Sequence, residues 1–499
     1  MTQDTIAPDQ HGQSPAPDGH KPTDNEPIGR SQLFALIAGP MAAIALGLLP
    51  PPGGLEPSAW YVVAITTWMV IWWLSEAIPL PATALIPIPL MPLLGVADAK
   101  SVTANYAHPL IFLFLGGFML AAAMQKSGLH KRIALNIIAA VGTSAPRVIG
   151  GFMLATAFLS MWISNTATTI MMYAVGVSVI QIVGSRMDSQ KDARNFAVAL
   201  LLGIAYSASI GGVGTLIGTP PNALLASVLE TTYQIRLDFV TWMMFGIPVV
   251  IVMLPIAWVL LTQVMFPVHS DDGASAGQVL QSELNGLGQL NRNEAMVLAI
   301  FLFAALGWVF GKQFSSLTGV PVNDTAIAIT AALLLYALPS SLRTGGFLLD
   351  WSSAKELPWG ILLIFGGGLA IAQGFHTTGL ASAIGESMKG LDGISIWLFV
   401  LLACALIVLL TEVTSNTASA ATFLPILGAI AVGLGQDPLL LMVPVALGAS
   451  MAFMMPVATP PNAIVFSYDE LKISDMVSAG IWLNLAAVGV CFGAVYLLA

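Results

Sequence analysis

The sequence predicts an all-α integral membrane protein made of two related halves. Of its 499 residues, 57% are hydrophobic and only 9% are charged, whereas an ordinary soluble domain has about 25% charged residues. Apolar stretches close to the ~20 residues that cross a bilayer as a helix recur from about Leu33 to the C-terminus. The tripeptide Ser-Asn-Thr stands at 164–166 and again at 415–417, each time inside an apolar stretch. The composition excludes a soluble catalytic domain of useful size.

The apolar pattern predicts about eleven membrane-crossing helices. Two further apolar stretches, 147–182 and 394–434, are each long enough for two passes but carry Ser-Asn-Thr near the middle. A continuous helix would place these polar side chains in hydrocarbon, so each stretch is predicted to be a re-entrant hairpin whose tip lies inside the protein. The predicted crossing spans are 33–50, 58–79, 81–96, 109–127, 192–233, 237–265, 293–311, 322–341, 356–378, 437–467 and 474–498.

The same pattern divides the chain into a tail, two repeats and a linker. Residues 1–30 are rich in Pro, Asp, Gln, Gly and His and lack the apolar core of a signal peptide, which predicts a disordered cytoplasmic tail. Residues 31–265 form the first predicted repeat, with the inner hairpin, and residues 293–499 form the second, with the outer hairpin. Residues 266–292 are expected to be a cytoplasmic linker. The net charge of −9 is spread out without a basic patch, so no nucleic-acid partner is expected.

The duplication is visible as motifs repeated at constant spacing. The two Ser-Asn-Thr copies are 251 residues apart (415 minus 164), and Thr-Pro-Pro-Asn at 219–222 recurs 240 residues later (459 minus 219) at 459–462. A shorter loop in the second half explains the smaller offset, because loops tolerate deletions best. Internal repeats with broken apolar segments indicate the binding site of a secondary transporter. The 251-residue offset also relates Gly116-Gly117 to Gly367-Gly368, and Ser160 to Thr411.

The distribution of basic residues predicts the orientation in the membrane. With the N-terminus inside, 13 of the 17 Lys and Arg residues fall on the inner side, in agreement with the positive-inside bias. The outer loops would hold Lys100, Arg236, Lys312 and Lys389. The N-terminus is therefore expected inside and the C-terminus outside, and the two repeats are expected to have inverted topology.

The repeated tripeptides favour a site that binds a cation and an anion together. Asn offers a carbonyl acceptor for a cation and an amide donor for a carboxylate, and the hydroxyl groups of Ser and Thr serve either. The returning helix of each hairpin begins at the tip, so its free N–H groups and positive dipole end face the site. The broken segments Ser207–Thr219 and Ala452–Thr459 are expected to expose backbone carbonyls that suit Na⁺.

A purely structural interpretation remains for any single motif. Ser and Thr in membrane helices often bond to their own preceding carbonyls, and a Pro-Pro pair can be only a kink. Packing needs alone do not explain why both motifs recur in register. No Lys or Arg stands in the tips or the broken segments, so helix ends, side-chain donors and co-bound cations would have to neutralise a bound anion. Burying an uncompensated dianion is too costly, which predicts obligatory coupling to a cation.

Two carboxylates within apolar surroundings are further candidates. Glu412 follows Thr411 near the second tip and is a candidate for tuning the cation site or for a proton step, although the first half has no equivalent. Glu76 stands close to Pro79 and Pro81, and a bond at a helix end is the favoured role for it.

Two other classes of membrane protein are disfavoured. An enzyme would need a nucleophile, base or metal set, but the sequence has no His-Glu-x-x-His motif and no histidine beside either tip. A channel would favour a continuous polar pore, whereas two opposed hairpins suit alternating access.

Taken together, the motifs resemble the divalent anion:sodium symporter (DASS) family, among the bacterial INDY-like dicarboxylate carriers. The resemblance spans about residues 33–499, and it is specific because both tripeptides and both breaks match in order. The segments that carry it are Ser-Glu-Ala-Ile-Pro-Leu-Pro at 75–81, Ser-Met-Trp-Ile-Ser-Asn-Thr at 160–166, Gly-Thr-Leu-Ile-Gly-Thr-Pro-Pro-Asn at 214–222 and Thr-Glu-Val-Thr-Ser-Asn-Thr at 411–417.

This resemblance implies a homodimer in the bacterial inner membrane, with a fixed scaffold domain and a transport domain that moves as an elevator. It implies Na⁺ as the co-transported ion and a first Na⁺ site made by Ser160, Ser164 and Asn165 with carbonyls near Gly212 and Gly214. The implied second site consists of Thr411, Ser415 and Asn416 with a carbonyl near Ala458. The implied substrate ligands are Asn165, Thr166, Ser415, Asn416 and Thr417, with Thr219 and Pro460 lining the pocket.

The paired tripeptides resemble the dicarboxylate branch of the family, which implies Na⁺-coupled symport of C4-dicarboxylates such as succinate, malate or fumarate into the cell, with the C-terminus in the periplasm. Hydroxyl residues at Ser160 and Thr411 favour symport, although some family members exchange dicarboxylates without Na⁺. The residues leave open sulfate or tricarboxylate transport and Na⁺-independent dicarboxylate exchange.

Overall fold

The computed structural model describes residues 29–187, 189–268, 273–341, 345–388 and 395–498. The predicted disordered tail, residues 1–30, lies outside the described residues except for its last two positions.

The regular secondary structure of the described residues is helical, apart from one isolated bridge between Pro339 and Phe347. The first half contains α1 (Arg30–Leu48), η1 (Pro52–Gly54), α2 (Pro57–Ser75), α3 (Leu80–Thr83), α4 (Pro87–Leu93), α5 (Ala99–Ala104), η2 (Asn105–Ala107), α6 (Pro109–Ser127), α7 (Leu129–Val141), α8 (Ala145–Ser160), α9 (Asn165–Gly184), α10 (Gln190–Gly212), α11 (Pro220–Tyr233), α12 (Phe239–Val259) and η3 (Leu260–Met265). The remainder contains α13 (Gly273–Leu287), α14 (Arg292–Thr318), α15 (Asp324–Ala337), α16 (Trp351–Lys355), α17 (Trp359–Thr377), α18 (Leu380–Met388), α19 (Ile396–Leu410), α20 (Asn416–Gly433), α21 (Leu439–Gly448), α22 (Pro460–Phe466) and α23 (Ile473–Leu498).

The predicted all-α membrane fold is confirmed. Within the described part of the chain, ten helices are long and apolar enough to cross a membrane. The spans predicted at 192–233 and 437–467 are each divided into two helices, α10 with α11 and α21 with α22. Proline causes the division. Helices α11 and α22 each begin with two prolines, which lack the backbone N–H that a continuous helix needs.

The broken segments differ from their predicted limits. Helix α10 continues through Gly212, so the first break covers only 213–219, and the second break begins earlier than expected, directly after Gly448. The end of α10 stays helical because its small residues pack tightly against α8, and a Cβ on Gly211 would lie only 2.2 Å from the carbonyl oxygen of Ala157. Close packing therefore outweighs the low helix propensity of glycine at this position.

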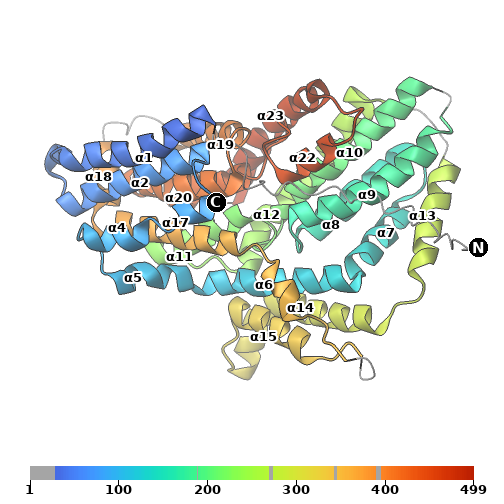
Figure 1. The fold of residues 1–499 in the computed structure, drawn as a ribbon, viewed down its shortest axis with the longest axis horizontal. Coiled ribbons are helices and arrows are strands. Elements are labelled where there is room, and N and C mark those ends of the chain that lie inside the picture. Colours follow the sequence, from blue (N-terminus) through green and yellow to red (C-terminus); the bar gives the residue numbers. More distant parts are fainter. Residues whose placement is uncertain (1–28, 188, 269–272, 342–344, 389–394, 499) are drawn as a thin grey trace, which may run out of the picture.

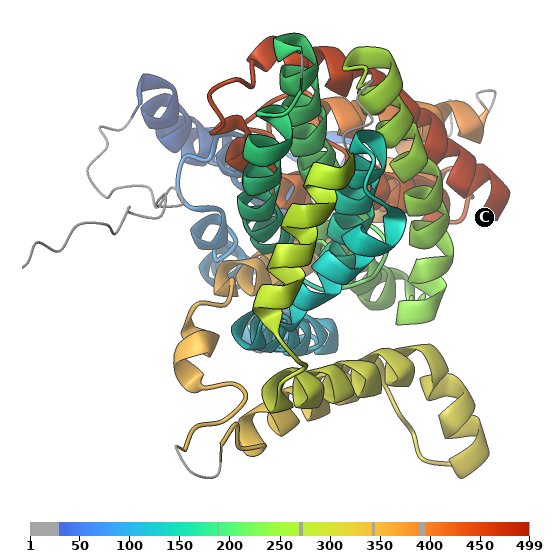
Figure 2. The same cartoon turned by 90° about the vertical axis from the view of Figure 1, so that its right-hand side faces the viewer.

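Five of the described α-helices, α5, α7, α13, α16 and α18, lie outside the predicted spans. They are short, and α7 carries charged residues among its apolar ones, so a search for long apolar stretches does not detect them. Helix α13 lies in the predicted linker and packs against α7, α8 and α9. In Figure 2, α14 and α15 form the lower edge of the molecule and α13 rises from that edge.

The two halves have corresponding elements in the same order. Helices α6, α7, α8 and α9 correspond to α17, α18, α19 and α20, and α11 corresponds to α22. Figure 1 shows α8 and α9 toward one end of the long axis and α18 and α20 toward the other. The repeated glycines lie where helices cross: a Cβ on Gly116 would lie 2.7 Å from the backbone of Ala328, and one on Gly367 would lie 2.6 Å from the carbonyl of Ala84.

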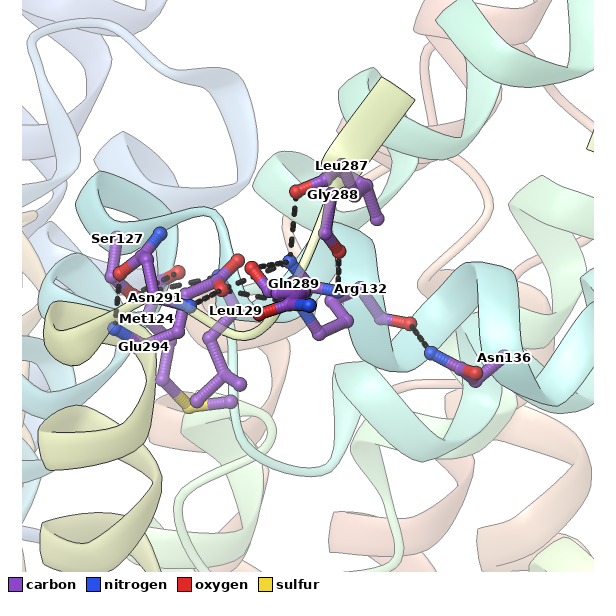
Figure 3. Close-up of polar contacts among 10 residues, drawn as sticks. All are labelled: Met124, Ser127, Leu129, Arg132, Asn136, Leu287, Gly288, Gln289, Asn291 and Glu294. Atoms are coloured by element: carbon purple, nitrogen blue, oxygen red, sulfur yellow. Dashed lines mark hydrogen bonds and ion pairs between the residues drawn. The ribbon is translucent and has the colours of Figure 1, made fainter. Parts of the chain in front are cut away.

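A buried polar junction joins the start of α7 to the start of α14 (Figure 3). Helix α7 follows α6 directly through Gly128, whose φ of +79° is a left-handed conformation that favours glycine. The guanidinium of Arg132 contacts the carboxylate of Glu294 at 3.0 Å, and the two side chains are only 16% and 4% exposed. Arg132 also donates to the carbonyls of Leu287, Gly288 and Gln289. The junction thus ties α7, which leads into the first hairpin, to the end of the linker and the start of α14.

We expect Arg132→Ala to lower the free energy of unfolding by about 3 kcal/mol, because the buried Glu294 carboxylate would lose its charged partner. The matched control is Lys131→Ala: Lys131 pairs with Glu283, but the two side chains are 37% and 35% exposed, so the expected loss is below about 1 kcal/mol. Thermal unfolding of the purified variants measures both effects. Equal losses in the two variants would contradict a special role for the buried junction.

Candidate functional site

The first hairpin tip forms a cluster of three oxygen atoms. Helix α8 ends at Ser160 and α9 begins at Asn165, with Ser164 as its N-cap residue accepting a hydrogen bond from the N–H of Ala167 at 3.3 Å. The Ser160 hydroxyl lies 2.5 Å from Asn165 Oδ1 and 2.7 Å from the carbonyl oxygen of Ala208. A hydroxyl has one proton to donate, so the cluster holds more acceptors than its single donor can satisfy.

The second tip repeats this arrangement. The Thr411 hydroxyl lies 2.6 Å from Asn416 Oδ1 and 2.8 Å from the carbonyl oxygen of Ala449. Both carbonyls come from the C-terminal end of a helix, α10 in the first half and α21 in the second. Hydroxyl, amide and carbonyl oxygens at helix ends are the ligands that carriers use for Na⁺.

Each broken segment is held by the asparagine of its Thr-Pro-Pro-Asn motif. The Asn222 side-chain amide donates to the carbonyls of Gly212 at 3.1 Å and Thr215 at 2.7 Å. The Asn462 amide donates to the carbonyls of Ala452 at 3.2 Å and Met455 at 3.0 Å. Both asparagines are fully buried. Each therefore satisfies carbonyls that no helical N–H reaches, and keeps the segment in one conformation.

In each half, the helix that follows the break packs against the other half. Helix α11 of the first half packs against α20 and α21 of the second, and α22 of the second half packs against α9 and α10 of the first. At the same crossing, the Thr219 hydroxyl lies 3.4 Å from that of Ser450. The site is therefore built jointly by both halves.

The implied site residues differ in their surroundings. Ser160, Asn165 and Gly212 lie together, since a Cβ on Gly212 would lie 2.7 Å from Asn165 Oδ1. Thr411 and Asn416 also lie together, but the carbonyl that Thr411 contacts belongs to Ala449, whereas Ala458 stands nine residues later (458 minus 449). Gly214 faces the side chain of Met161. The remaining implied residues are buried (Thr219), half-buried (Thr166, Ser415 and Thr417) or exposed (Ser164 and Pro460).

Sequence reasoning missed four groups that build the site. The side chains of Asn222 and Asn462 could have been found, because both belong to a repeated motif. The carbonyls of Ala208 and Ala449 carry no such signal, because every residue has a carbonyl and only the fold shows which ones meet a hydroxyl.

The backbone contributes a positive potential at both tips. Helices α9 and α20 start at Asn165 and Asn416, so the positive ends of their dipoles lie at the two tips. These ends attract an anion, while the oxygen clusters beside them attract a cation. The arrangement can hold both charges close together without a Lys or Arg side chain.

Duplicated hairpins, broken helices and oxygen clusters on a membrane-spanning helical fold define a secondary transporter. Two solved structures share the fold: the YdaH transporter of Alcanivorax borkumensis (TM-score 0.50, 13% identity, 87% of this chain and 97% of that chain) and MtrF of Neisseria gonorrhoeae (TM-score 0.53, 13% identity, 92% and 93%). At this level of identity, the likeness concerns the fold alone.

The sequence comparisons give the family. The profile described as the sodium:sulfate symporter transmembrane region matches residues 30–497, and the protein belongs to this family. The sodium-dependent dicarboxylate transporter SdcS of Staphylococcus saprophyticus is 41% identical over 483 residues, covering 95% of this chain and 93% of the relative. SdcS of Staphylococcus aureus shows the same identity and coverage. The resemblance to the divalent anion:sodium symporters is thereby confirmed.

Gly212→Ala tests the packing of the first tip. We expect transport to fall at least about tenfold, because the new methyl group would displace the Asn165 amide by more than the few tenths of an ångström that close packing tolerates. Gly203→Ala on the same helix is the control, since its methyl group would meet the flexible side chain of Met153 at 3.0 Å and that of Ile149 at an ordinary contact distance of 3.6 Å. Uptake by reconstituted vesicles is the measurement, and equal activity of the two variants would contradict the close contact.

Proposed function

We propose that the protein is a secondary active transporter that carries a C4-dicarboxylate such as succinate, malate or fumarate into the cell together with Na⁺. The two oxygen clusters at the hairpin tips carry the proposal, because each offers several uncharged oxygens and little donor capacity. The staphylococcal relatives, which are named sodium-dependent dicarboxylate transporters, support both the ion and the substrate class.

Each tip contributes one Na⁺ site in this proposal. The first uses Ser160, Ser164 and Asn165 with carbonyls near Gly212 and Gly214, and the short contacts of Ser160 and Asn165 support it. The second uses Thr411, Ser415, Asn416 and a carbonyl near Ala458. The carbonyls of Ala208 and Ala449 are added to the two sets, since each already lies within hydrogen-bond distance of the hydroxyl.

The dicarboxylate binds between the tips in this proposal, at Asn165, Thr166, Ser415, Asn416 and Thr417, with Thr219 and Pro460 lining the pocket. Amide and hydroxyl groups donate to its carboxylates, and the N-terminal ends of α9 and α20 add positive potential. Na⁺ binds to the oxygens on the other side of the same asparagines. Bound Na⁺ would therefore orient the amides and balance part of the substrate charge, which couples the two solutes.

Alternating access completes the mechanism. In this proposal the hairpins and broken helices, α8 to α12 with α19 to α23, form one body, and α1 to α6 with α14 to α17 form most of the other, with α17 packed against α11 and α20 where the two bodies meet. The first body corresponds to the transport domain of an elevator and the second to its scaffold. Gly128 and Gly379 have φ of +79° and +74° at equivalent helix junctions between the bodies, where a left-handed glycine permits a sharp turn. The proposed assembly is a homodimer, as the family resemblance implies.

Sulfate is the second candidate substrate, because the family description names it. Tricarboxylate transport and Na⁺-independent dicarboxylate exchange compete with both. The same vesicle experiment distinguishes them from dicarboxylate symport.

Reconstituted protein should accumulate radiolabelled succinate in empty vesicles under an inward Na⁺ gradient, and K⁺ in place of Na⁺ should abolish the uptake. Asn165→Ala and Asn416→Ala should each reduce the rate at least about a hundredfold, since each removes an ion ligand and a substrate donor together. Unchanged transport in either variant would refute a shared site. Uptake that needs internal succinate and ignores Na⁺ would identify an exchanger, and labelled sulfate and citrate test the remaining substrates.

The proposed location is the bacterial inner membrane, with the N-terminus in the cytoplasm and the C-terminus in the periplasm. Lys100 and Lys191 are both exposed and lie on opposite predicted sides. In a variant without native cysteines, Lys100→Cys should react with a membrane-impermeant maleimide in spheroplasts, and Lys191→Cys should react only after lysis. The reverse labelling pattern would invert the proposed orientation.

A further inference from the structure

Glu412 lies at the second hairpin tip, beside Thr411, and is only 4% exposed. Its carboxylate accepts hydrogen bonds from three successive backbone N–H groups: Phe453 at 2.6 Å, Met454 at 3.0 Å to each oxygen, and Met455 at 3.0 Å. The side-chain amide of Asn484 on α23 donates a further bond of 2.7 Å. Five contacts thus join this carboxylate to the broken segment and to a helix of the same body.

These partners are all uncharged. Successive backbone N–H groups that converge on one point form an anion-binding concavity, and here the anion is a side chain of the protein itself. The ion pairs found among the described residues do not include Glu412. The negative charge is therefore stabilised by dipoles and is not cancelled by a positive side chain, so it still attracts a cation nearby.

The carboxylate also fixes the direction of the carbonyls. In a trans peptide the C=O and N–H groups point in opposite directions. The N–H groups of Phe453, Met454 and Met455 point at Glu412, so the carbonyls bonded to them, those of residues 452–454, point away from it. The carbonyl of Ala452 accordingly accepts from Asn462 at 3.2 Å on the far side. Glu412 thus fixes the middle of the segment that runs from Ala449 to Ala458, whose carbonyls belong to the second Na⁺ site proposed above.

The first repeat holds its equivalent segment by other means. Met161 occupies the position of Glu412 (412 minus 251), and its carbonyl accepts a hydrogen bond from the Thr215 hydroxyl. The indole of Trp242 donates to the carbonyl of Val213 at 2.9 Å. These bonds are neutral and bring no negative charge to the tip. The two broken segments therefore differ in their electrostatics.

We propose that Glu412 is a positioning residue that holds the second broken segment, from Ala449 to Ala458, in place and adds a negative charge beside Thr411, so that the second Na⁺ site depends on this carboxylate and the first does not. The proposal rests on the Na⁺-coupled transport proposed above. It makes the two ion sites unequal: the second binds Na⁺ more tightly, and losing the carboxylate leaves the first site as the functional one.

The test is the Na⁺ dependence of succinate uptake by Glu412→Gln in vesicles. Because the variant loses the negative charge and its charge-assisted hydrogen bonds, the Na⁺ concentration for half-maximal uptake should rise about tenfold or more, and the Hill coefficient should fall toward one. The succinate KM at saturating Na⁺ should change less than about threefold, because the substrate donors keep their places. Two results would overturn the proposal. One is a succinate KM that rises by the same factor as the half-maximal Na⁺ concentration, and the other is a lower maximal rate with unchanged Na⁺ dependence.

Two further variants keep the test decisive. Asn484→Ala removes one donor but retains the carboxylate and its backbone partners, and it should shift the Na⁺ dependence by about two- to threefold in the same direction. Met161→Leu changes the equivalent position of the first repeat and should leave the Na⁺ dependence within about twofold. If Glu412→Gln does not fold, normal Na⁺ dependence of Asn484→Ala overturns the proposal by itself.

A binding experiment separates this inference from the transport proposal. Na⁺ should raise the thermal unfolding temperature of the detergent-purified wild type, with choline as the control cation, and Glu412→Gln should need about tenfold more Na⁺ for the same rise. Wild-type protein that shows neither Na⁺-driven uptake nor Na⁺ stabilisation would refute the proposed function. A wild type that shows both, with Glu412→Gln behaving identically, would refute only the role of Glu412.

Discussion

The fold depends on satisfying backbone groups where two helices are broken inside an apolar protein. A helix interrupted at such depth leaves N–H and C=O groups that lipid cannot solvate. In the first half the amide of Asn222 and the indole of Trp242 take part in satisfying them, and in the second half Asn462 and Glu412 do so. The carbonyls beside the tips are thereby held in fixed positions, and the oxygen clusters exist because of this support.

Hydropathy and repetition were sufficient to predict the helical membrane fold and both hairpins. Long apolar stretches have few alternatives in a bilayer, and a polar tripeptide repeated with the same spacing marks the same local structure twice. Helices α7, α13 and α18 were not predicted, because short segments of mixed polarity have no distinctive apolar length. The limits of the breaks were also inexact, since they depend on how closely Gly211 packs against α8.

The site was predictable as a set of motifs but not as a set of contacts. Ser160, Asn165, Thr411 and Asn416 could be selected because they recur in register. The contacts of Glu412 could not, because its backbone partners lie 41 to 43 residues away and Asn484 lies 72 residues away. Since Glu412 has no counterpart in the first half, repetition gave no signal for it either. Sequence symmetry therefore finds what the two halves share and misses what distinguishes them.

The exchange of α11 and α22 between the halves has a consequence for how the chain becomes folded during synthesis. When the ribosome has completed the first half, the hairpin α8–α9 still lacks α22, and α11 has no α20 or α21 to pack against. The uncovered surfaces of this hairpin and of α11 therefore stay exposed in the bilayer until more than two hundred further residues have been inserted (460 minus 233). Each half therefore covers surfaces of the other, and we expect the two halves to fold cooperatively.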